Sequence, residues 1–310
     1  MSNADLMHRF APAAPAFRPP ATGLSGRLAD MVVAALVDEA TLTPKPGLVD
    51  MRSRGAHADL SWALMCHSAG VLRPSFEAMA QAGMAIGNAG RLRERIGAIG
   101  RTAEHAMMQA TGGINTHRGA IWAMGLLVTA AAQAPRSLAP AAVTARAAAL
   151  ARRPDRFAPV LTGNKGELAC HAYGVGGARS QAQAGFPHII KRALPRLHAS
   201  RAAGDGEGAA RLNALLAVIA ELDDTCILSR GGSAALHAAQ SGAHGILAAG
   251  GVAGTAGKRL LAAFEVDLLA RNVSPGGAAD LLAATLFLDR LQHTEHTQHT
   301  EHTAHTAHTA

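Results

Sequence analysis

The chain has 310 residues, of which 3% are aromatic and 16% are charged, and its formal net charge is +7. The basic residues are scattered and few aromatic side chains are present to stack on bases, so the composition excludes a typical nucleic-acid surface and favours a small phosphorylated ligand. The three cysteines lie far apart, which excludes a disulfide framework and favours the reduced cytoplasm.

Alanine and leucine recur along the whole chain, and strand-like runs of β-branched and aromatic residues are nearly absent. We therefore expect an all-α fold, with one compact domain of roughly ten helices and glycine-rich loops over residues 24–291. Residues 1–23 are rich in Ala and Pro and are expected to be a disordered arm without the apolar segment of a secretory signal. Residues 292–310 are a low-complexity tail in which His and Thr repeat.

Apolar periodicity and capping residues place the helices along the chain. The predicted ranges are about 26–42, 59–70, 75–85, 91–110, 117–133, 140–152, 188–200, 209–228, 233–248, 256–271 and 276–291. Asp59 is the expected N-cap of the second helix. Residues 154–187 are expected to be irregular because they are rich in glycine. Residues 231–257 lack Asp, Glu, Lys and Arg but have too few large apolar residues for a membrane span.

Two prolines flank Lys45 in the segment that runs from Thr43 to Asp50. Proline fixes its own backbone and pushes the preceding residue out of the helical region, so this segment is expected to be stiff and extended. It therefore holds Lys45 and Asp50 at defined places, as in a binding site. The alternative is a proline-rich helix end with solvated charges.

The helix at 117–133 follows a polar segment. Asn115 or Thr116 is a suitable N-cap, and His117 and Arg118 then fall in the first turn. Because the helix dipole disfavours cations there, the pair suggests a bound anion. Alternatively, both side chains simply face water.

The last body helix begins in a similar way. Ser274 is expected to cap it, with Pro275 in the first helical position, while Gly276 and Gly277 leave their N–H groups uncovered for an anion or a carbonyl. Asp280 follows one turn later. The alternative is an ordinary Ser-Pro helix start.

Asp223 and Asp224 are expected at the end of an apolar helix, where the dipole and their mutual repulsion are unfavourable. A divalent metal ion would offset this, and so would an ion pair with Arg230. In the segment 174–179, several glycines precede Arg179 and suggest a phosphate-binding loop, although glycine loops alone are weak evidence.

These segments together resemble the ATP:dephospho-coenzyme A triphosphoribosyltransferase family over roughly residues 26–291. The matching stretches, in the family's order, are TPKPGLVD (43–50), GAHADL (55–60), NTHRGAIW (115–122), YGVGGAR with AGFP (173–187), DDTCILSRGG (223–232) and NVSPGGAADLLAATLFL (272–288). The form with Cys226 is more similar to the malonate decarboxylase branch than to the citrate lyase branch. One departure is Ser180-Gln181, where family members usually carry an acidic residue, so the role of that carboxylate does not carry over.

The resemblance implies an unusual use of ATP. The 2′-hydroxyl of 3′-dephospho-coenzyme A attacks C1 of the ATP ribose, adenine leaves, and the triphosphate stays on the transferred ribose. The product is the precursor of the prosthetic group on the acyl-carrier subunit of malonate decarboxylase or of citrate lyase, to which a later transferase attaches it. The expected partners are therefore ATP and 3′-dephospho-coenzyme A with Mg²⁺, in the cytoplasm, without nucleic acid or membrane; a homodimer is an open alternative to a monomer.

Substitution at an anomeric carbon needs a base, a donor for the leaving group and cations for the triphosphate. The candidate catalytic residues are Asp50, His57, Asp59 and Asp280. The candidate ATP-binding residues are Lys45, Asn115, Thr116, His117, Arg118, Arg179, Arg230, Ser274, Gly276 and Gly277. Asp223 and Asp224 are the candidate ligands of Mg²⁺. The sequence does not divide the individual roles among these residues.

Two other functions remain open at this point. A Mg²⁺-dependent N-glycosidic hydrolase acting on ADP-ribosyl groups or nucleotides shares the anomeric chemistry but uses water as the nucleophile. A non-catalytic protein that binds coenzyme A or the carrier subunit performs no reaction. Release of adenine separates the three, because only the synthase releases it in a way that depends on dephospho-coenzyme A.

Overall fold

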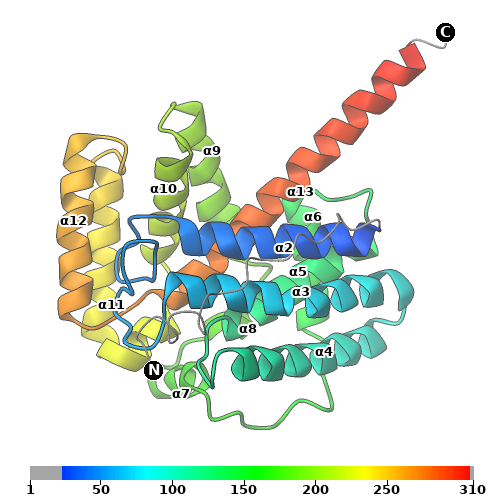
Figure 1. The fold of residues 1–310 in the computed structure, drawn as a ribbon, viewed down its shortest axis with the longest axis horizontal. Helices are drawn as coiled ribbons and strands as arrows, with labels where there is room; N and C mark the ends of the chain where they lie inside the picture. Colours follow the sequence, from blue (N-terminus) through cyan, green and yellow to red (C-terminus); the bar gives the residue numbers. More distant parts are fainter. Residues whose placement is uncertain (1–22, 308–310) are drawn as a thin grey trace, which may run out of the picture.

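A computed structural model of the chain describes residues 23–307, with side chains up to residue 293. In this part the secondary structure is helical throughout, which confirms the predicted all-α fold. The helices are α2 (Leu24–Thr41), α3 (Trp62–Ala85), α4 (Ala89–Ala110), α5 (Arg118–Gln133), α6 (Pro140–Ala151), α7 (Lys165–Tyr173), α8 (Gly177–Gln183), the π-helical turn η1 (Ile189–Ala193), α9 (Leu194–Ala202), α10 (Glu207–Ile219), α11 (Thr225–Ala248), α12 (Thr255–Ala270) and α13 (Gly276–Ala307) (Figure 1). Apart from Gly23, the predicted N-terminal arm lies outside the described residues.

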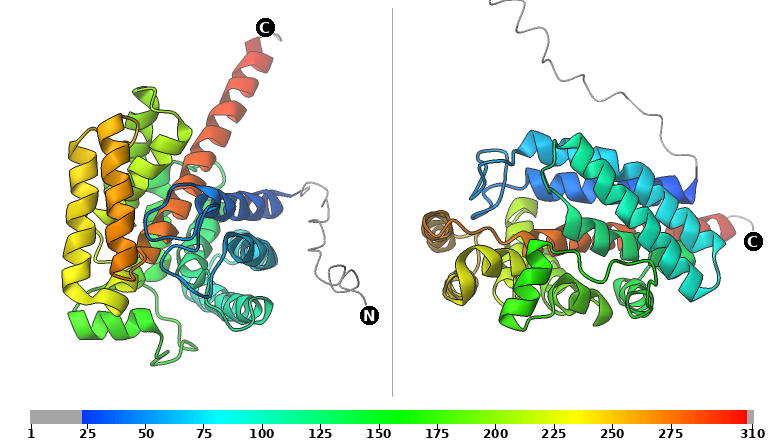
Figure 2. Two further views of the ribbon diagram at one scale, coloured as in Figure 1. Left: turned by 60° about the vertical axis from the view of Figure 1, so that its left-hand side comes forward. Right: turned by 90° about the horizontal axis from the view of Figure 1, so that it is seen from below.

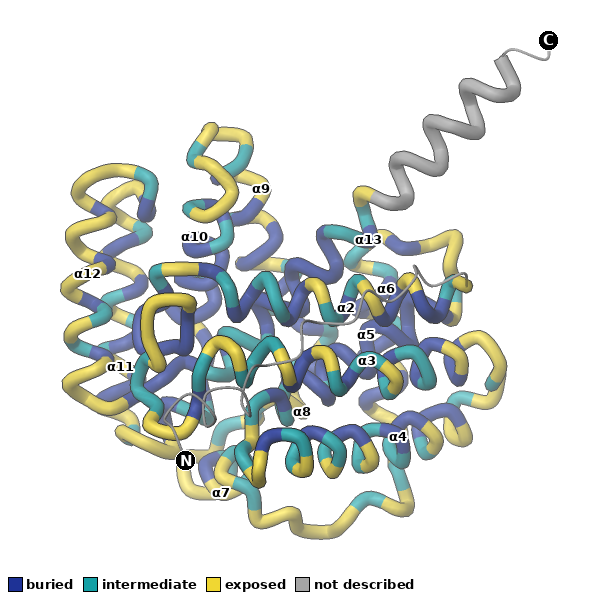
Figure 3. The backbone as a smooth tube through the Cα atoms, viewed as in Figure 1, coloured by how far each residue is buried: buried dark blue, intermediate teal, exposed yellow. Residues whose placement is uncertain are grey.

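Helices α5 and α13 form the centre of the fold. Nearly all of α5 is buried from Ala120 to Ala132, and every residue of α13 is buried from Leu281 to Asp289. A helix that is buried on all sides must be surrounded by other helices. Accordingly, α5 packs against α2, α3, α4, α6 and α8, whereas α13 contacts α2 and α5 on one side and α10 and α11 on the other. Figures 2 and 3 show α13 passing between the two groups of helices, with burial concentrated along both central helices.

Local sequence explains where several helices begin and which face they bury. On α2, Leu28, Val32 and Leu36 recur every four residues and are all buried, as expected for one helical face. The Ser61 hydroxyl accepts a hydrogen bond from the Leu64 N–H (3.3 Å) at the start of α3. An N-cap of this kind satisfies a donor that the helix itself leaves unpaired.

Between residues 59 and 85 the prediction of two helices is wrong. A single helix, α3, spans this region with Pro74 inside it, and Ser61 rather than Asp59 caps it. Proline removes one backbone hydrogen bond, but packing on both sides of it holds the helix together: Leu72 and Phe76 are both fully buried. Tertiary burial here outweighs the local preference to end the helix.

Three further regions differ from the sequence prediction. The expected helix at 209–228 ends at Ile219, and α11 begins at Thr225 and is interrupted at Gly232 (φ 67°, ψ −168°). The stretch at 154–187, expected to be irregular, contains the short helices α7 and α8. Helix α13 continues to Ala307 rather than ending near residue 291.

Within the described part of the chain, we find no helix with the length and hydropathy needed to span a bilayer.

Candidate active site

Four helices, α5, α7, α11 and α13, begin close to one another. Gly119 in the first turn of α5 lies against Asp280 of α13, so that a Cβ atom on Gly119 would stand 2.0 Å from the Asp280 Oδ2. A Cβ atom on Gly166, in the first turn of α7, would lie 3.6 Å from the Thr225 Oγ1 at the start of α11. Each helix N-terminus carries about half a positive charge, so this junction is suited to an anion.

Asp224 joins two of these helix starts. Its Oδ1 accepts hydrogen bonds from the N–H groups of Cys226 (2.8 Å) and Ile227 (3.4 Å) in α11, and its Oδ2 accepts one from Ala278 (2.9 Å) in α13. The prediction that Asp223 and Asp224 end a helix is therefore wrong, because Asp224 is the N-cap of α11, where the dipole favours a negative charge. Burial raises the pKa of Asp224, and these N–H groups offset part of that rise. Asp223 is exposed beside it.

The start of α13 also differs from the prediction. The Ser274 hydroxyl is buried and has no hydrogen-bond partner within the described residues, so it does not cap this helix. The Asp224 carboxylate takes that role by accepting the Ala278 N–H. Gly276 and Gly277 are half-buried, and both pack against the turn that carries Asp224 and Cys226. Burial raises the pKa of the Cys226 thiol well above its usual value, so this sulfur stays protonated near neutral pH.

Asp280 is a second carboxylate of the junction, and its one backbone donor is the Ala120 N–H. Burial, followed by the charges of Glu39 and Asp224, raises its pKa well above the ordinary value, and the Ala120 N–H opposes this only in part. The side chain nevertheless retains some solvent exposure. A carboxylate whose pKa is raised can act as a proton acceptor for a substrate that reaches it.

Three cations surround the junction, and they come from different elements. Arg118, the first residue of α5, is about one-third exposed, and its Nε lies 3.2 Å from the Glu104 carboxylate. Arg230 of α11 donates to the Ala56 carbonyl (2.6 Å) and to the His57 Nδ1 (3.0 Å). Lys165 begins α7, and its charge contributes to the lowered pKa of His57.

His57 is neutral in this environment. Burial and then the Arg230 guanidinium lower its pKa to about 4, and Asp59 opposes them only partly. The Asp59 side chain is 60% exposed and its carboxylate lies 3.8 Å from the Nδ1. Because the Nδ1 accepts a hydrogen bond from Arg230, the proton of the neutral ring lies on the Nε2, which makes that atom a hydrogen-bond donor.

Lys45 is buried rather than held at the surface as a free cation. Its side chain is 2% exposed and its Nζ pairs with the carboxylate of Glu39, which is itself 5% exposed in the last turn of α2. The alternative of a helix end with solvated charges is therefore wrong for Lys45, and its contact with the phosphates of ATP stays a prediction. A buried pair of this kind is stabilising only while both partners are present.

Asp50 organises the same loop. Burial alone would raise its pKa, but hydrogen bonds from the Thr43 hydroxyl (2.8 Å) and the N–H groups of Lys45 (3.1 Å), Arg52 (2.7 Å) and Ser53 (2.9 Å) lower it overall. A carboxylate whose lone pairs are occupied in this way is a poor proton acceptor. The geometry therefore favours a structural role for Asp50 over the predicted role of base.

His117 occupies the space beneath the start of α5. Its Nδ1 lies 3.0 Å from the Ser68 Oγ, which in turn lies 2.6 Å from the Thr116 Oγ1. Burial and then the charge of Lys45 lower the pKa of His117 to about 4, so the ring is neutral. The prediction that Asn115 or Thr116 is the N-cap, with His117 in the first turn, is wrong: α5 begins at Arg118 and His117 occupies the N-cap position. The Asn115 Oδ1 still accepts a hydrogen bond from the Arg118 N–H (3.1 Å), but from two residues before that position.

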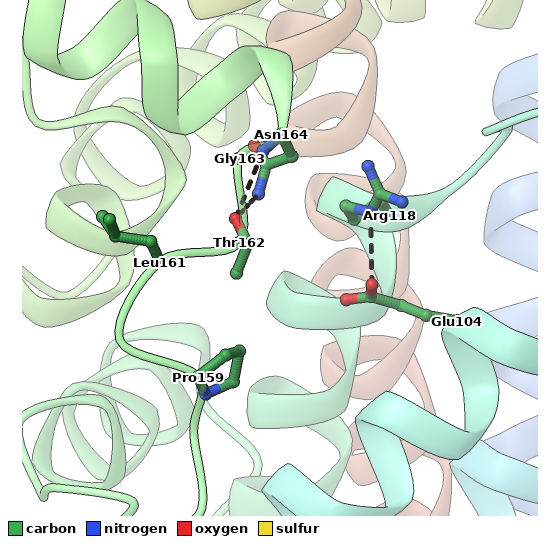
Figure 4. Close-up of a pocket in the computed structure, with 7 residues that line it drawn as sticks. All are labelled: Glu104, Arg118, Pro159, Leu161, Thr162, Gly163 and Asn164. Atoms are coloured by element: carbon green, nitrogen blue, oxygen red, sulfur yellow. Dashed lines mark hydrogen bonds and ion pairs between the residues drawn. The ribbon is translucent and has the colours of Figure 1, made fainter.

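Arg179 is exposed on α8, whose first residue, Gly177, lies beside the junction: a Cβ atom there would stand 3.4 Å from the Thr225 Cγ2. Burial lowers the pKa of Arg93 on α4; Asp155 opposes this shift, and the nearby charge of Arg179 adds to it. The structure therefore places Arg179 beside α4, on the side of the fold where a groove opens. This groove has a volume of about 550 Å³ and is lined by Glu104, Arg118 and residues of the segment 159–164 (Figure 4).

Comparison with known proteins places the chain in a family. Residues 25–299 match the CitG family, described as ATP:dephospho-CoA triphosphoribosyl transferase. The chain belongs to this family. An Azotobacter vinelandii protein named as a probable 2-(5''-triphosphoribosyl)-3'-dephosphocoenzyme-A synthase is 55% identical over 274 residues, which cover 88% of this chain and 94% of that protein. A Klebsiella pneumoniae protein named as the same synthase is 54% identical over 264 residues, or 85% and 94% of the two chains. No solved structure matches.

Membership of the CitG family confirms the resemblance drawn from the sequence motifs. The structure also adds two residues that the motifs did not single out, Glu39 and Lys165. Glu39 falls three residues after the buried Leu36, on the apolar face of α2, and this position was the available signal for a buried acid. Lys165 follows the Asn164 cap of α7 and carried no distinguishing signal.

Proposed function

We propose that the chain transfers the triphosphoribosyl group of ATP to the 2′-hydroxyl of 3′-dephospho-coenzyme A and releases adenine. The observation that carries this proposal is the meeting of four helix N-termini beside Arg118, Arg230 and Lys165. An ATP-using transferase that keeps the triphosphate on its product needs a strong anion site. The names of the CitG-family relatives agree with this reaction.

In the proposed complex, the triphosphate lies at the four helix N-termini. The positive ends of the helix dipoles attract it, and the side chains of Arg118, Arg230 and Lys165 bind its oxygens and neutralise its charge. Arg230 also fixes the loop between α2 and α3 through the Ala56 carbonyl and His57, so the cation is held in place before substrate arrives. Such preorganisation lowers the cost of binding.

The two reacting groups need a proton acceptor and a donor. Asp280 takes the proton of the attacking 2′-hydroxyl, because its pKa is raised and it accepts fewer backbone hydrogen bonds than Asp224. As the bond between C1 and the adenine nitrogen breaks, the Nε2–H of His57 donates a hydrogen bond to the departing base, and water returns to that base the proton that Asp280 has taken. The positive charge that develops on the ribose is stabilised by neighbouring carboxylates, as in other substitutions at an anomeric carbon.

Mg²⁺ is the metal ion that we propose with the triphosphate. Residues 23–293 contain no group of three or more His, Cys, Asp or Glu side chains arranged as metal ligands. Mg²⁺ carried by phosphate oxygens and water needs only one or two carboxylates. Asp223 fits this role because it is exposed, whereas the Asp224 oxygens already accept backbone N–H groups. When bound, the ion neutralises part of the phosphate charge.

The place of the reaction in the cell also belongs to the proposal. The form with Cys226 supports a product that serves the acyl-carrier subunit of malonate decarboxylase, made in the cytoplasm and attached by a separate transferase. A homodimer remains an open prediction.

The decisive experiment measures free adenine from ATP with the purified chain, with and without 3′-dephospho-coenzyme A. We expect release only when the acceptor is present, together with a product heavier than the acceptor by the mass of the triphosphoribosyl group. Release without the acceptor identifies a hydrolase instead. No release under either condition, with coenzyme A still bound, identifies a binding protein.

A further inference from the structure

Arg118 differs from Arg230, the other arginine among the three junction cations, in what its guanidinium contacts. The Nη1 and Nη2 groups of Arg230 already donate, to the Ala56 carbonyl (2.6 Å) and to the His57 Nδ1 (3.0 Å). Arg118 uses its Nε, which donates to the Glu104 Oε2 at 3.2 Å, and its two Nη groups make no hydrogen bond within the described residues. Free Nη groups are what an arginine needs to bind a phosphate through two hydrogen bonds.

Two contacts hold Arg118 while leaving those groups free. Its backbone N–H donates to the Asn115 Oδ1 (3.1 Å), just before α5. Its Nε donates to a carboxylate from another element, because Glu104 lies in the second half of α4. Figure 4 shows the Nε side of the guanidinium turned toward Glu104, and both residues line the groove opposite the segment 159–164. The side chain is thus fixed at its base and at its Nε, beside a space that a ligand can enter.

The ion pair between Arg118 and Glu104 contributes little to the stability of the fold. The side chains of Arg118 and Glu104 are 33% and 40% exposed, and exposed pairs of this kind add little to the free energy of unfolding. A carboxylate beside an anion site also repels the anion, which by itself weakens binding. The presence of Glu104 at this place is therefore explained neither by stability nor by charge.

We propose that Glu104 is a positioning residue for the triphosphate, which holds the Arg118 guanidinium by its Nε so that both Nη groups are free to meet phosphate oxygens; this inference rests on the proposed function. An arginine without such a partner samples many rotamers, and ordering it when the ligand arrives weakens binding. Glu104 orders the side chain in advance. It contacts the arginine and not the substrate.

Two substitutions separate the hydrogen bond of Glu104 from its charge. Glu104→Gln keeps an oxygen that can accept the Nε–H, Glu104→Ala removes it, and both remove the negative charge. Calorimetry then measures the binding of inorganic tripolyphosphate to the purified full chain and to each variant. Glu94 provides the matched control, because it also lies on α4 and its carboxylate is 3.1 Å from the Arg156 Nε, while neither residue lines the groove.

Glu104→Ala should bind tripolyphosphate about 3- to 10-fold more weakly than Glu104→Gln, which is the scale for ordering one long side chain on binding. Glu104→Gln should bind at least as tightly as the wild type, because it keeps the acceptor and loses a repelling charge. The melting temperatures of both variants should stay close to that of the wild type, since the pair is exposed. Glu94→Ala and Glu94→Gln should bind tripolyphosphate equally.

Equal binding by Glu104→Ala and Glu104→Gln overturns the proposal. A difference between them that persists in the background of Arg118→Ala also overturns it, because Glu104 then acts without the arginine. Failure of the wild type to bind tripolyphosphate has the same consequence, since it removes the phosphate that Arg118 is held to meet.

These binding measurements are separate from turnover. If the wild type releases no adenine but the two Glu104 variants differ as expected, the proposed reaction fails while the role of Glu104 stands. If adenine is released only with the acceptor present and the two variants bind tripolyphosphate equally, the reaction stands and the role of Glu104 fails.

Discussion

Buried charges occur both in the loop between α2 and α3 and at the junction of helix starts. The charges of the loop are paired within the protein more completely than those of the junction. In the loop, Lys45 is neutralised by Glu39, and Asp50 receives four hydrogen bonds from Thr43 and the backbone within 3.1 Å. At the junction, Arg118 keeps about one-third of its side chain exposed. The Asp280 carboxylate accepts one hydrogen bond, from a backbone N–H group, and it lies near two other acidic side chains, Glu39 and Asp224.

The two carboxylates show what this difference means. Hydrogen bonds lower the pKa of Asp50 although it is buried, whereas burial and neighbouring negative charge raise that of Asp280. Charges satisfied within the protein hold a backbone in place, and charges left partly unsatisfied are available to a substrate. Changes in the loop should therefore reduce stability, and changes at the junction should reduce turnover.

The largest effect is expected for Asp280→Asn. Asparagine keeps the size of the side chain but cannot accept the proton of the 2′-hydroxyl, so adenine release should fall by about 10²- to 10⁴-fold. The melting temperature should stay equal or rise, because a carboxylate beside Glu39 and Asp224 has been removed. Turnover within a few-fold of the wild type contradicts the role of Asp280 as base.

The pH dependence of stability provides a control for the same residue. The raised pKa of Asp280 means that the folded state binds more protons than the unfolded state, so this group lowers the free energy of unfolding as the pH rises from about 4 through the folded pKa. The contribution of Asp50 has the opposite sign and is lost as the pH falls through its lowered pKa. Chemical denaturation of Asp280→Asn against pH should therefore show a smaller loss of stability toward neutral pH.

In the loop, Lys45→Met is expected to lower the free energy of unfolding by about 3–5 kcal/mol, because it leaves the Glu39 carboxylate buried without its partner. The double change of Lys45→Met with Glu39→Leu removes both charges and should recover most of the loss. Denaturation curves for the three proteins measure this. A stable single variant contradicts the buried pair and restores Lys45 as a candidate phosphate contact.

At the junction, Arg118→Ala should weaken catalysis by about 2–4 kcal/mol in transition-state terms, the range for one charge-assisted contact to a phosphate. Its stability should change little, because its ion pair with Glu104 is partly exposed. The values of kcat/KM for ATP and the melting temperature test both statements. A loss of stability without a loss of activity would show that Arg118 supports the fold and does not bind the phosphates.

The adjacent aspartates allow a matched comparison. Asp224→Asn alters the cap shared by α11 and α13 and should cost about 1 kcal/mol of stability or more. Asp223→Asn leaves these hydrogen bonds in place and should instead raise the Mg²⁺ concentration needed for half-maximal turnover. Activity measured against Mg²⁺ for both variants decides the point, and two curves like that of the wild type remove Mg²⁺ from Asp223.

The sequence was sufficient for the helical class and for the segments that meet at the junction. Long periodic helices and Gly or Pro at their ends are strong local signals, which explains why the starts of α5 and α13 were predicted within a residue. The sequence did not reveal that a new helix begins at Thr225, because the apolar spacing continues through Leu222 and Ile227 across the turn. Burial of Lys45 was also missed, since a lysine between prolines looks the same in sequence whether or not Glu39 lies opposite it.

The smallest effect is expected from removing residues 294–310. This segment contains only Thr, His, Glu, Gln and Ala, so it has no large apolar side chain with which to add buried surface. Asp289, with its partners Arg201 and His198, lies before the cut and keeps its interactions. The truncated protein should therefore match the full chain in melting temperature and in adenine release. A large fall in either one would show that the repeat of His and Thr contributes to the fold or to the site, and a fall in activity alone would connect it to substrate binding.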